Sequence, residues 1–221
     1  MGYDEQYADL DAVFGTEPEA TLVDFSPRLP AGAVVLDIGA GQGRNTLYLA
    51  RRGVEVHALE PSVVAAEALR RQVAESEFPA EIFTNTFEEF APAVDHYAGI
   101  LVFGLTPDLA WSAIGELVKS VRSWGAPGSL LWITGFTTDD PAHDRIRATW
   151  TTIGSNSYRK ADGHLRTYLE PGQILGLLPD YTVLHHWEGL GPEHRHGDGP
   201  PERHGRFEAV LQQPVQVSGR E

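Results

Sequence analysis

The segment DIGAGQG, residues 37–43, constrains the fold of this chain more than any other feature, because it joins a buried strand to a helix. Residues 33–38 form a continuous apolar run rich in β-branched side chains, which is typical of a central strand buried on both faces of a parallel sheet. Residues 44–52 carry clustered apolar side chains and are followed by Gly53, which favours a helix. The glycines between them allow a sharp turn and let a ligand approach main-chain atoms. The pattern therefore predicts a strand, a ligand-binding loop and a helix.

The chain continues as an alternation of short apolar runs and helical patterns up to residue 137. Such alternation favours a parallel sheet covered by helices. The predicted strands are residues 54–59, 81–86, 98–103 and 129–134, and the predicted helices are residues 61–74 and 111–124.

The pattern changes after Gly135. We expect a helix over residues 141–153, a polar irregular segment over 154–170, and a short helix over 171–178. Residues 181–188 and 206–212 then read as two strands with no helix between them, so they should pair antiparallel across a long loop, residues 189–205.

These elements predict one α/β domain over residues 1–221. Within it, residues 1–20 are expected to form an N-terminal cap segment. Residues 33–137 are expected to form a cofactor-binding core, and residues 138–213 a substrate-side segment and the terminal antiparallel hairpin.

The spacing within the glycine loop separates two kinds of ligand. A dinucleotide-binding loop needs G-x-G-x-x-G, but Arg44 stands where the third glycine should be, which weakens an NAD(P) interpretation. Asp37, two residues before the first glycine, suits a ligand that carries an ammonium or a sulfonium. Glu60 follows the next strand, where a carboxylate accepts hydrogen bonds from ribose hydroxyls. The alternative is a merely structural turn in which Asp37 is a local cap.

Charge and composition exclude several classes of protein. The chain has 17 Lys and Arg against 31 Asp and Glu, a formal net charge of −14, which repels phosphate backbones and argues against general nucleic-acid binding. It has no cysteine, so a disulfide-stabilised secreted scaffold is excluded. The first ten residues resemble no secretory signal, and no run of 18 apolar residues follows. We expect a cytoplasmic protein, monomer or homodimer, with a small-molecule partner and neither nucleic acid nor a membrane.

Residues 35–50 (VLDIGAGQGRNTLYLA) resemble the cofactor loop of class I S-adenosylmethionine-dependent methyltransferases, specifically those similar to tellurite-resistance (TehB-type) small-molecule methyltransferases. Near the N-terminus, residues 3–7 and 14–18 are similar to the segment that covers the cofactor in that group. Residues 163–168, the pair His194 and Arg195, and residues 206–207 look like its C-terminal half.

The resemblance implies a three-layer Rossmann-like sandwich with a seven-stranded, mostly parallel sheet in the order 3-2-1-4-5-7-6, strand 7 being antiparallel. It implies S-adenosylmethionine as cofactor and S-adenosylhomocysteine as product. Asp37 and residues 39–41 would bind the methionine part, Glu60 the ribose, and residues 85–87 the adenine. The cofactor-binding residues expected from it are Asp37, Gly39, Ala40, Gly41, Asn45, Glu60, Pro61, Ser62, Asn85, Thr86, Phe87, Phe103 and Tyr7.

Two positions depart from the family's patterns. An acidic residue that often receives the adenine amine is replaced by Asn85 or Thr86, whose side-chain oxygens still accept hydrogen bonds. The segment after the fourth strand, residues 103–108, lacks the Asn/Asp-Pro-Pro-Tyr motif of many amino-group methyltransferases. This argues against adenine-N6 and glutamine as substrates.

The loop between the last two strands gathers six basic side chains within 13 positions, His194, Arg195, His196, Arg203, His204 and Arg206. Three interpretations are open. The loop is a solvated hairpin, or it forms a rim in which Arg195 holds an anion and His194 acts as a base, or His194, His196 and His204 bind a metal. We assign the catalytic role to His194 and Arg195 and predict no metal.

Methyl transfer from a sulfonium is an in-line displacement in which the protein supplies alignment and, for a hydroxyl acceptor, a base; a thiolate needs none. The chain is therefore predicted to be a methyltransferase that acts on an oxygen, sulfur or chalcogen nucleophile of a small molecule. Alternatives are a non-catalytic S-adenosylmethionine-binding protein and an NAD(P)-dependent oxidoreductase. The predicted substrate-binding residues are Tyr3, Leu105, Arg166, Tyr168 and Arg206.

Overall fold

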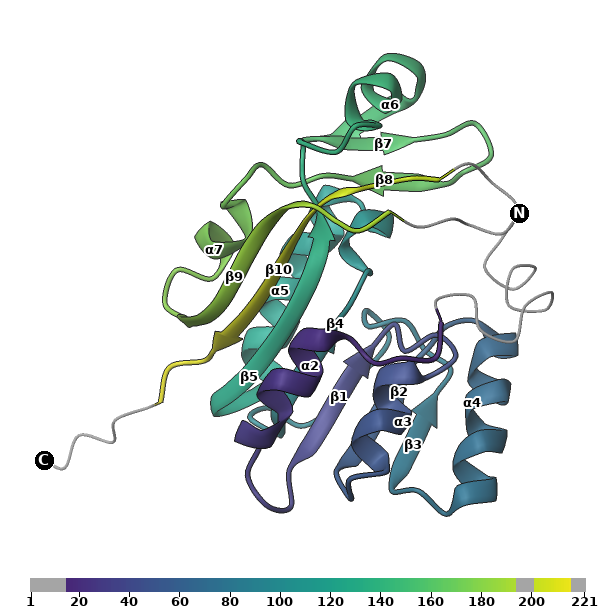
Figure 1. Ribbon diagram of the computed structural model, residues 1–221, viewed down its shortest axis with the longest axis vertical. Helices are drawn as coiled ribbons and strands as arrows, with labels where there is room; N and C mark the ends of the chain where they lie inside the picture. The colour runs from purple at the N-terminus through teal and green to yellow at the C-terminus, as the bar shows by residue number, and fades with distance from the viewer. Residues whose placement is uncertain (1–14, 194–200, 216–221) are drawn as a thin grey trace, which may run out of the picture.

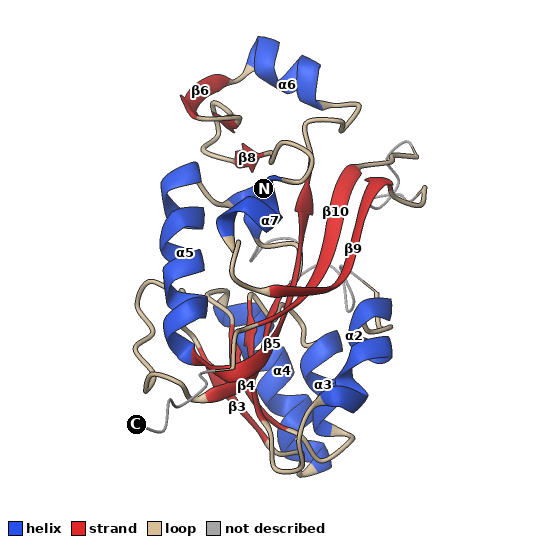
Figure 2. Ribbon diagram, turned by 90° about the vertical axis from the view of Figure 1, so that its left-hand side faces the viewer, coloured by secondary structure: helices blue, strands red, loops and turns tan. Residues whose placement is uncertain are grey.

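A computed structural model describes residues 15–193 and 201–215 of the chain, which form three layers (Figures 1 and 2). The central layer is a seven-stranded sheet in the order β3-β2-β1-β4-β5-β10-β9, in which β10 runs antiparallel to both of its neighbours. Its strands are β1 (Val34–Ile38), β2 (Glu55–Leu59), β3 (Ala80–Phe83), β4 (Tyr97–Val102), β5 (Gly125–Phe136), β9 (Thr182–Leu190) and β10 (Gly205–Gln212). This confirms the predicted order, with β9 and β10 as the sixth and seventh strands of the sheet.

Helices cover both faces of the sheet. Figures 1 and 2 place α2, α3 and α4 on one side and α5 on the other. The helices are α2 (Ala20–Phe25), α3 (Arg44–Ala50), α4 (Val63–Ser76), α5 (Trp111–Trp124), α6 (His143–Thr149) and α7 (Gln173–Leu177), with short 3-10 turns η1 (Ser26–Arg28) and η2 (Thr106–Asp108). None of the helices in the described ranges is long and apolar enough to cross a membrane.

The alternation of side chains along β1 assigns its residues to the two faces. Leu36 and Ile38 pack with residues of α5 and α7, whereas Val35 packs with residues of α2 and α3. Asp37 has the parity of Val35 and therefore lies on the α2 and α3 face. Because β1 is central, both its faces are buried, as its apolar sequence predicts.

Helix α2 was not predicted, and a tryptophan on the sheet explains why it docks there. The indole nitrogen of Trp132, a fully buried residue of β5, donates a hydrogen bond of 3.0 Å to the carbonyl of Thr21. Leu22 of α2 is also fully buried beside it. A buried indole N–H needs such an acceptor, so this contact fixes α2 against the sheet.

The prediction of an irregular segment over residues 154–170 is wrong. The chain forms a second, three-stranded antiparallel sheet of β6 (Thr151–Gly154), β7 (Ser157–Arg159) and β8 (Leu165–Thr167). The β-branched run 151–153 followed by a two-residue turn with Asn156 at φ +46° is a hairpin signal that the polar composition concealed. The predicted helix 141–153 is correspondingly shorter. The small sheet and α6 lie beyond the upper end of β5 in Figure 1.

Among the other boundaries that differ from the predictions, two have a visible cause. Helix α4 starts at Val63 rather than at Pro61, because the Ser62 side chain accepts a hydrogen bond of 3.2 Å from the Ala65 amide and caps the helix there. Strand β3 ends at Phe83 rather than at residue 86. The Arg70 guanidinium binds the Ile82 carbonyl and the Thr84 hydroxyl, at 3.0 and 2.6 Å, where the strand ends.

Gly43, the N-cap of α3, illustrates why this turn needs glycine. Its φ is +87°, and a Cβ at this position would lie 2.2 Å from Cδ1 of the fully buried Leu69 on α4. Gly53, just after α3, has a similar φ of +78° but open space around it. The two glycines share the conformational requirement, and Gly43 alone adds a steric one.

This pair gives a stability prediction. Gly43→Ala should lower the free energy of unfolding by about 1–3 kcal/mol more than Gly53→Ala, because overpacking against Leu69 adds to a conformational cost that both variants share. Urea denaturation of the two variants and the unsubstituted protein measures the difference. Equal losses in the two variants would contradict the packing of α3 against α4.

Candidate active site

The glycine loop after β1 is folded back on the end of β2. The amides of Gly39 and Ala40 both donate to the Leu59 carbonyl at 2.9 Å. Gly39 and Gly41 have φ values of +76° and +56°. A Cβ on Gly39 would make only an ordinary contact with the Leu105 side chain, at 3.6 Å, so the positive φ rather than the packing requires glycine here.

Glu60, at the end of β2, binds the same loop. Its Oε2 accepts a hydrogen bond of 2.8 Å from the Gly41 amide, and its Oε1 accepts one of 2.8 Å from the Ser62 amide. The residue is only 5% exposed. Glu60 therefore holds the glycine loop against the end of β2 through both of its carboxylate oxygens.

Asp37 presents a buried carboxyl group at the carboxyl end of β1. It is 2% exposed, and its Oδ2 accepts a hydrogen bond of 2.7 Å from the Thr46 hydroxyl on α3. Burial raises the pKa of Asp37 from its ordinary 3.8 to about 6, against the opposing effects of the Thr46 hydrogen bond and the Arg44 charge. A cationic group placed beside this carboxylate would stabilise its ionised form.

Arg44 and Asn45, the first residues of α3, bind the segment before α2. Arg44 forms an ion pair with Glu19 and donates to the Glu17 carbonyl at 3.3 Å. The Asn45 Oδ1 accepts a hydrogen bond of 3.0 Å from the Glu19 amide. The side chain that stands in place of a third glycine therefore connects the N-terminal segment to the ligand-binding loop, a role that the sequence did not reveal.

The other residues predicted to contact the cofactor border this loop or follow neighbouring strands. Asn85 and Thr86, after β3, are half-buried, and Phe87 is buried. Phe103 and Leu105, after β4, are half-buried, whereas Pro61 is exposed. The carboxyl ends of β1, β2, β3 and β4 lie at one edge of the sheet, so these residues gather at the same edge.

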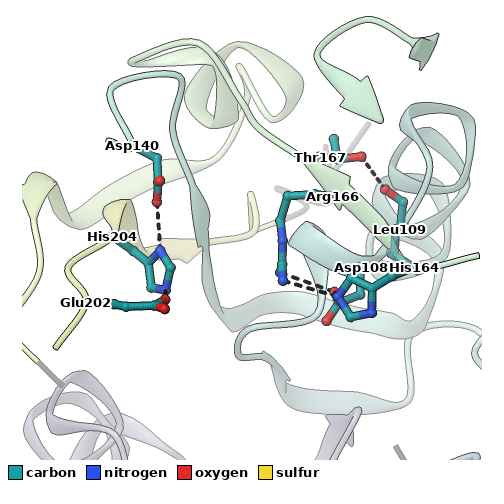
Figure 3. Close-up of polar contacts among 8 residues, drawn as sticks. All are labelled: Asp108, Leu109, Asp140, His164, Arg166, Thr167, Glu202 and His204. Carbon is teal, nitrogen blue, oxygen red and sulfur yellow. Dashed lines mark hydrogen bonds and ion pairs between the residues drawn. The ribbon is translucent and has the colours of Figure 1, made fainter. Parts of the chain in front are cut away.

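A second group of polar side chains lies where the small sheet meets η2 (Figure 3). The Arg166 guanidinium on β8 contacts the Asp108 carboxylate at 3.3 Å and the His164 ring at 3.2 Å, and its Cζ lies 5.3 Å from the centre of the Phe136 ring. The Thr167 hydroxyl donates to the Leu109 carbonyl and fastens β8 to this turn.

The remaining predicted substrate-binding residues lie elsewhere. Tyr168 is 1% exposed and packs against the rings of Phe136, His143 and Tyr158. Arg206 on β10 forms an ion pair with Glu208 and lies over the Trp187 ring. The structure therefore brings neither residue together with Arg166 in one polar cluster.

His204, which the sequence offered only as a metal ligand, forms a close pair with Asp140. The predicted catalytic residues His194 and Arg195, and also Tyr3, Tyr7 and His196, lie outside the described residues. Among residues 15–193 and 201–215, no group of three or more His, Asp or Glu side chains is arranged to hold a metal ion.

Comparison with known proteins identifies the kind of domain. A family model described as "Methyltransferase domain" matches residues 11–204. A search of curated proteins finds no matching sequence.

Several solved structures share the fold. A SAM-dependent methyltransferase from Methanosarcina mazei is 14% identical with a TM-score of 0.71, and the match covers 90% of this chain and all of that one. TehB from Haemophilus influenzae is 17% identical with a TM-score of 0.68, over 88% of this chain and 62% of that one. The 1,6-didemethyltoxoflavin-N1-methyltransferase from Burkholderia thailandensis is 18% identical with a TM-score of 0.66, over 95% and 84% of the two chains. At these identities the likeness establishes the fold.

The raised pKa of Asp37 makes stability depend on pH. The folded protein holds this proton more tightly than the unfolded chain does, so the free energy of unfolding falls as the pH rises from about 4 to about 6. Above pH 6 nearly all of this loss of stability is present, on the order of 3 kcal/mol. Asp37→Asn keeps an acceptor for the Thr46 hydroxyl and removes the buried charge.

We therefore expect Asp37→Asn to unfold at a higher urea concentration than the unsubstituted protein at pH 7.5, with the difference disappearing at pH 4. Measuring both proteins at both pH values cancels the titration of the other carboxylates. An Asn variant that is less stable at pH 7.5 would contradict a buried, charge-destabilised Asp37.

Proposed function

This chain belongs to the methyltransferase domain family, and we propose that it transfers the methyl group of S-adenosylmethionine to a nucleophilic atom of a small molecule. The observation that carries the proposal is the buried carboxyl of Asp37 beside a glycine loop whose next strand ends in Glu60. The Asp37 carboxylate suits the positively charged methionine part of the cofactor, and the Glu60 carboxylate suits the hydroxyls of its ribose.

The cofactor supplies a methyl group on a sulfonium, which a nucleophile displaces in line. In our proposal Asp37 stabilises the ligand's cationic amino-acid part from below the loop. Gly39 and Gly41 let that part approach the main chain, and Glu60 accepts hydrogen bonds from the ribose hydroxyls. Asn85 and Thr86, at the end of β3, accept hydrogen bonds from the adenine amine.

Arg166 provides the positive charge on the acceptor side. It lies on β8, with its guanidinium carbon 5.3 Å from the centre of the ring of Phe136, the last residue of β5. Asp108 balances part of its charge. A small acceptor with a carboxylate or another oxyanion would be oriented by this guanidinium. Tyr3, Tyr7, His194 and Arg195 complete the proposed site from outside the described residues.

Two features favour a small acceptor. The protein's net charge of −14 disfavours a nucleic acid. The structurally similar Burkholderia enzyme was solved with 1,6-didemethyltoxoflavin and S-adenosylhomocysteine bound, so this fold accommodates a small heterocycle beside the cofactor product in that protein. The proposed acceptor atom is oxygen, sulfur or a heavier chalcogen.

Calorimetric titration tests the cofactor assignment. S-adenosylmethionine and S-adenosylhomocysteine should bind with micromolar affinity at pH 7, whereas NADH should not bind. S-adenosylmethionine should bind about tenfold more weakly at pH 5, because a group with a pKa of about 6 is then mostly protonated and no longer offers a negative charge.

Asp37→Asn is the matched control for the pH effect. It should bind S-adenosylmethionine more weakly than the unsubstituted protein at pH 7 and lose the greater part of the pH dependence. Binding of NADH alone would overturn the assignment in favour of an oxidoreductase. Binding of neither ligand would mark a domain that has lost its cofactor.

A further inference from the structure

Strand β9 leaves one edge of the seven-stranded sheet open. It is the last strand of the sheet, paired on one side with β10, and it runs for nine residues, Thr182–Leu190 (Figure 1). The opposite edge differs, because β3 has only four residues and the Arg70 guanidinium occupies its Ile82 carbonyl at 3.0 Å. A long open edge pairs readily with another strand, so β9 is the edge at which a partner strand can add.

The upper part of β9 lacks the features that commonly protect an open edge. The strand contains no lysine and no proline. Its one register shift skips Leu184, below the stretch from His185 to Leu190 that pairs regularly with β10. Trp187, in the middle of this stretch, is 39% exposed. Tryptophan is enriched where protein surfaces are buried against one another, so its place on an open strand favours an interface.

The pairing with β10 shows which main-chain groups of β9 face the open edge. The Gly191 amide donates to the His204 carbonyl at 2.8 Å, so residue 191 directs its main-chain groups toward β10. In an antiparallel pair these directions alternate from residue to residue. His186, Glu188 and Leu190 therefore direct their amides and carbonyls away from β10. No main-chain hydrogen bond joins these three residues to another segment among those that the structure describes.

A second β9 running antiparallel matches this edge when the twofold axis lies at Trp187. In a symmetric pair of this kind, the residue at the axis lies opposite its own copy. With the axis at Trp187, each His186 lies opposite Glu188 of the other copy, and the outward main-chain groups of these two residues can bond in both directions. An axis at Glu188 would place two carboxylates opposite each other. An axis at His186 would place Glu188 opposite Leu184, where the strand is irregular.

The side chains suit each other in this register. The His186 Nε2 lies 3.2 Å from the Glu188 Oε1 within one strand. The Gly172 amide donates to both oxygens of that carboxylate, at 2.8 and 3.0 Å, and holds it in place. A second, reversed copy of the pair makes imidazole and carboxylate alternate across the joint. Trp187 faces its own copy in a pair without direct main-chain bonds, where side chains come closest and aromatic pairs stabilise antiparallel strands.

The Trp187 ring is already held in one position on the surface of β9. A Cβ on Gly189 would lie 2.9 Å from its Cζ2, so the ring rests on the main chain of this glycine. The Arg206 guanidinium carbon lies 5.9 Å from the ring centre, and Arg206 forms an ion pair with Glu208. A side chain that is fixed in this way loses little entropy when a partner covers it.

We propose that the protein forms a twofold-symmetric homodimer in which two β9 strands pair antiparallel about Trp187 and continue the sheet from one subunit into the other. Val183 and Leu190 of the same strand, each 47% exposed, add apolar area beside the joint. The inference does not rest on the proposed methyl transfer. The glycine loop follows β1, and β4, β5 and β10 lie between β1 and β9, so each subunit keeps its own site.

Sedimentation velocity of the full chain, at concentrations from about 1 μM to about 100 μM, measures the oligomeric state. The unsubstituted protein should sediment as a dimer at the upper end of this range. Trp187→Lys should be a monomer throughout, because it places two like charges opposite each other at the axis. A monomer at every concentration of the unsubstituted protein would overturn the proposal, as would a dimer that Trp187→Lys leaves intact.

Val63→Lys is the matched control. It makes the same change of charge at an exposed apolar residue, since Val63 is 51% exposed. It begins α4, which packs against β3 at the opposite edge of the sheet. This variant should associate as the unsubstituted protein does, because the substitution lies far from β9.

A charge exchange separates strand pairing from folding. His186→Glu places two carboxylates opposite each other in a homodimer, and Glu188→Lys places a lysine opposite His186, so each variant alone should be monomeric. Mixed in equal amounts, the two variants should form a heterodimer, because the introduced glutamate then faces the introduced lysine. A mixture that stays monomeric would contradict the register about Trp187.

Amide hydrogen exchange locates the interface. The amides of His186 and Glu188 should exchange at least about tenfold more slowly in the dimer than in the Trp187→Lys monomer, because only the dimer gives them an acceptor. The Gly189 amide faces β10 in both proteins and should exchange at about the same rate in each. A dimer in which the His186 and Glu188 amides exchange as fast as in the monomer would place the interface elsewhere and overturn the proposal.

Discussion

The buried carboxylate of Asp37 is the constraint on which the ligand-binding half of the molecule depends. It lies at the carboxyl end of the central strand, where burial raises its pKa to about 6 and makes its charge unfavourable in the unliganded fold. A protein that keeps such a group must stabilise the charge by other means, here the Thr46 hydroxyl and, in our proposal, a cationic ligand. Glu60 holds the glycine loop beside it through the Gly41 amide.

The proposed acceptor side of the molecule depends on the length of β5. This strand and its antiparallel partner β10 continue beyond the row at which β1 and β4 end, so Phe136 stands above the edge of the sheet. The small sheet packs there through Tyr168 and Arg166, and the Asp140–His204 pair closes over the same ring. The ring of Phe136 at the end of β5 therefore contacts both the Arg166 guanidinium and the His204 imidazole. The antiparallel return of β10 is what brings residue 204 back to this end of the molecule.

The sequence predicted the sheet order and the glycine loop because both rest on local patterns: continuous apolar strands, positive-φ glycines such as Gly43, and the absence of a helix before the last strand. It did not predict the second sheet, where polar residues concealed a hairpin at residues 151–159. Nor did it predict the pairing of Asp140 with His204, which are 64 positions apart and meet only because β5 and β10 are neighbours. Contacts of that kind depend on register, which composition does not encode.

A crystal structure of the protein with S-adenosylhomocysteine tests the proposed roles of Asp37 and Glu60 most directly. We predict the amino-acid part of the cofactor product over Gly39 and Gly41, and the ribose hydroxyls on Glu60. A ribose bound away from Glu60, or an amino-acid part bound away from Asp37 and the glycine loop, would contradict the proposed site.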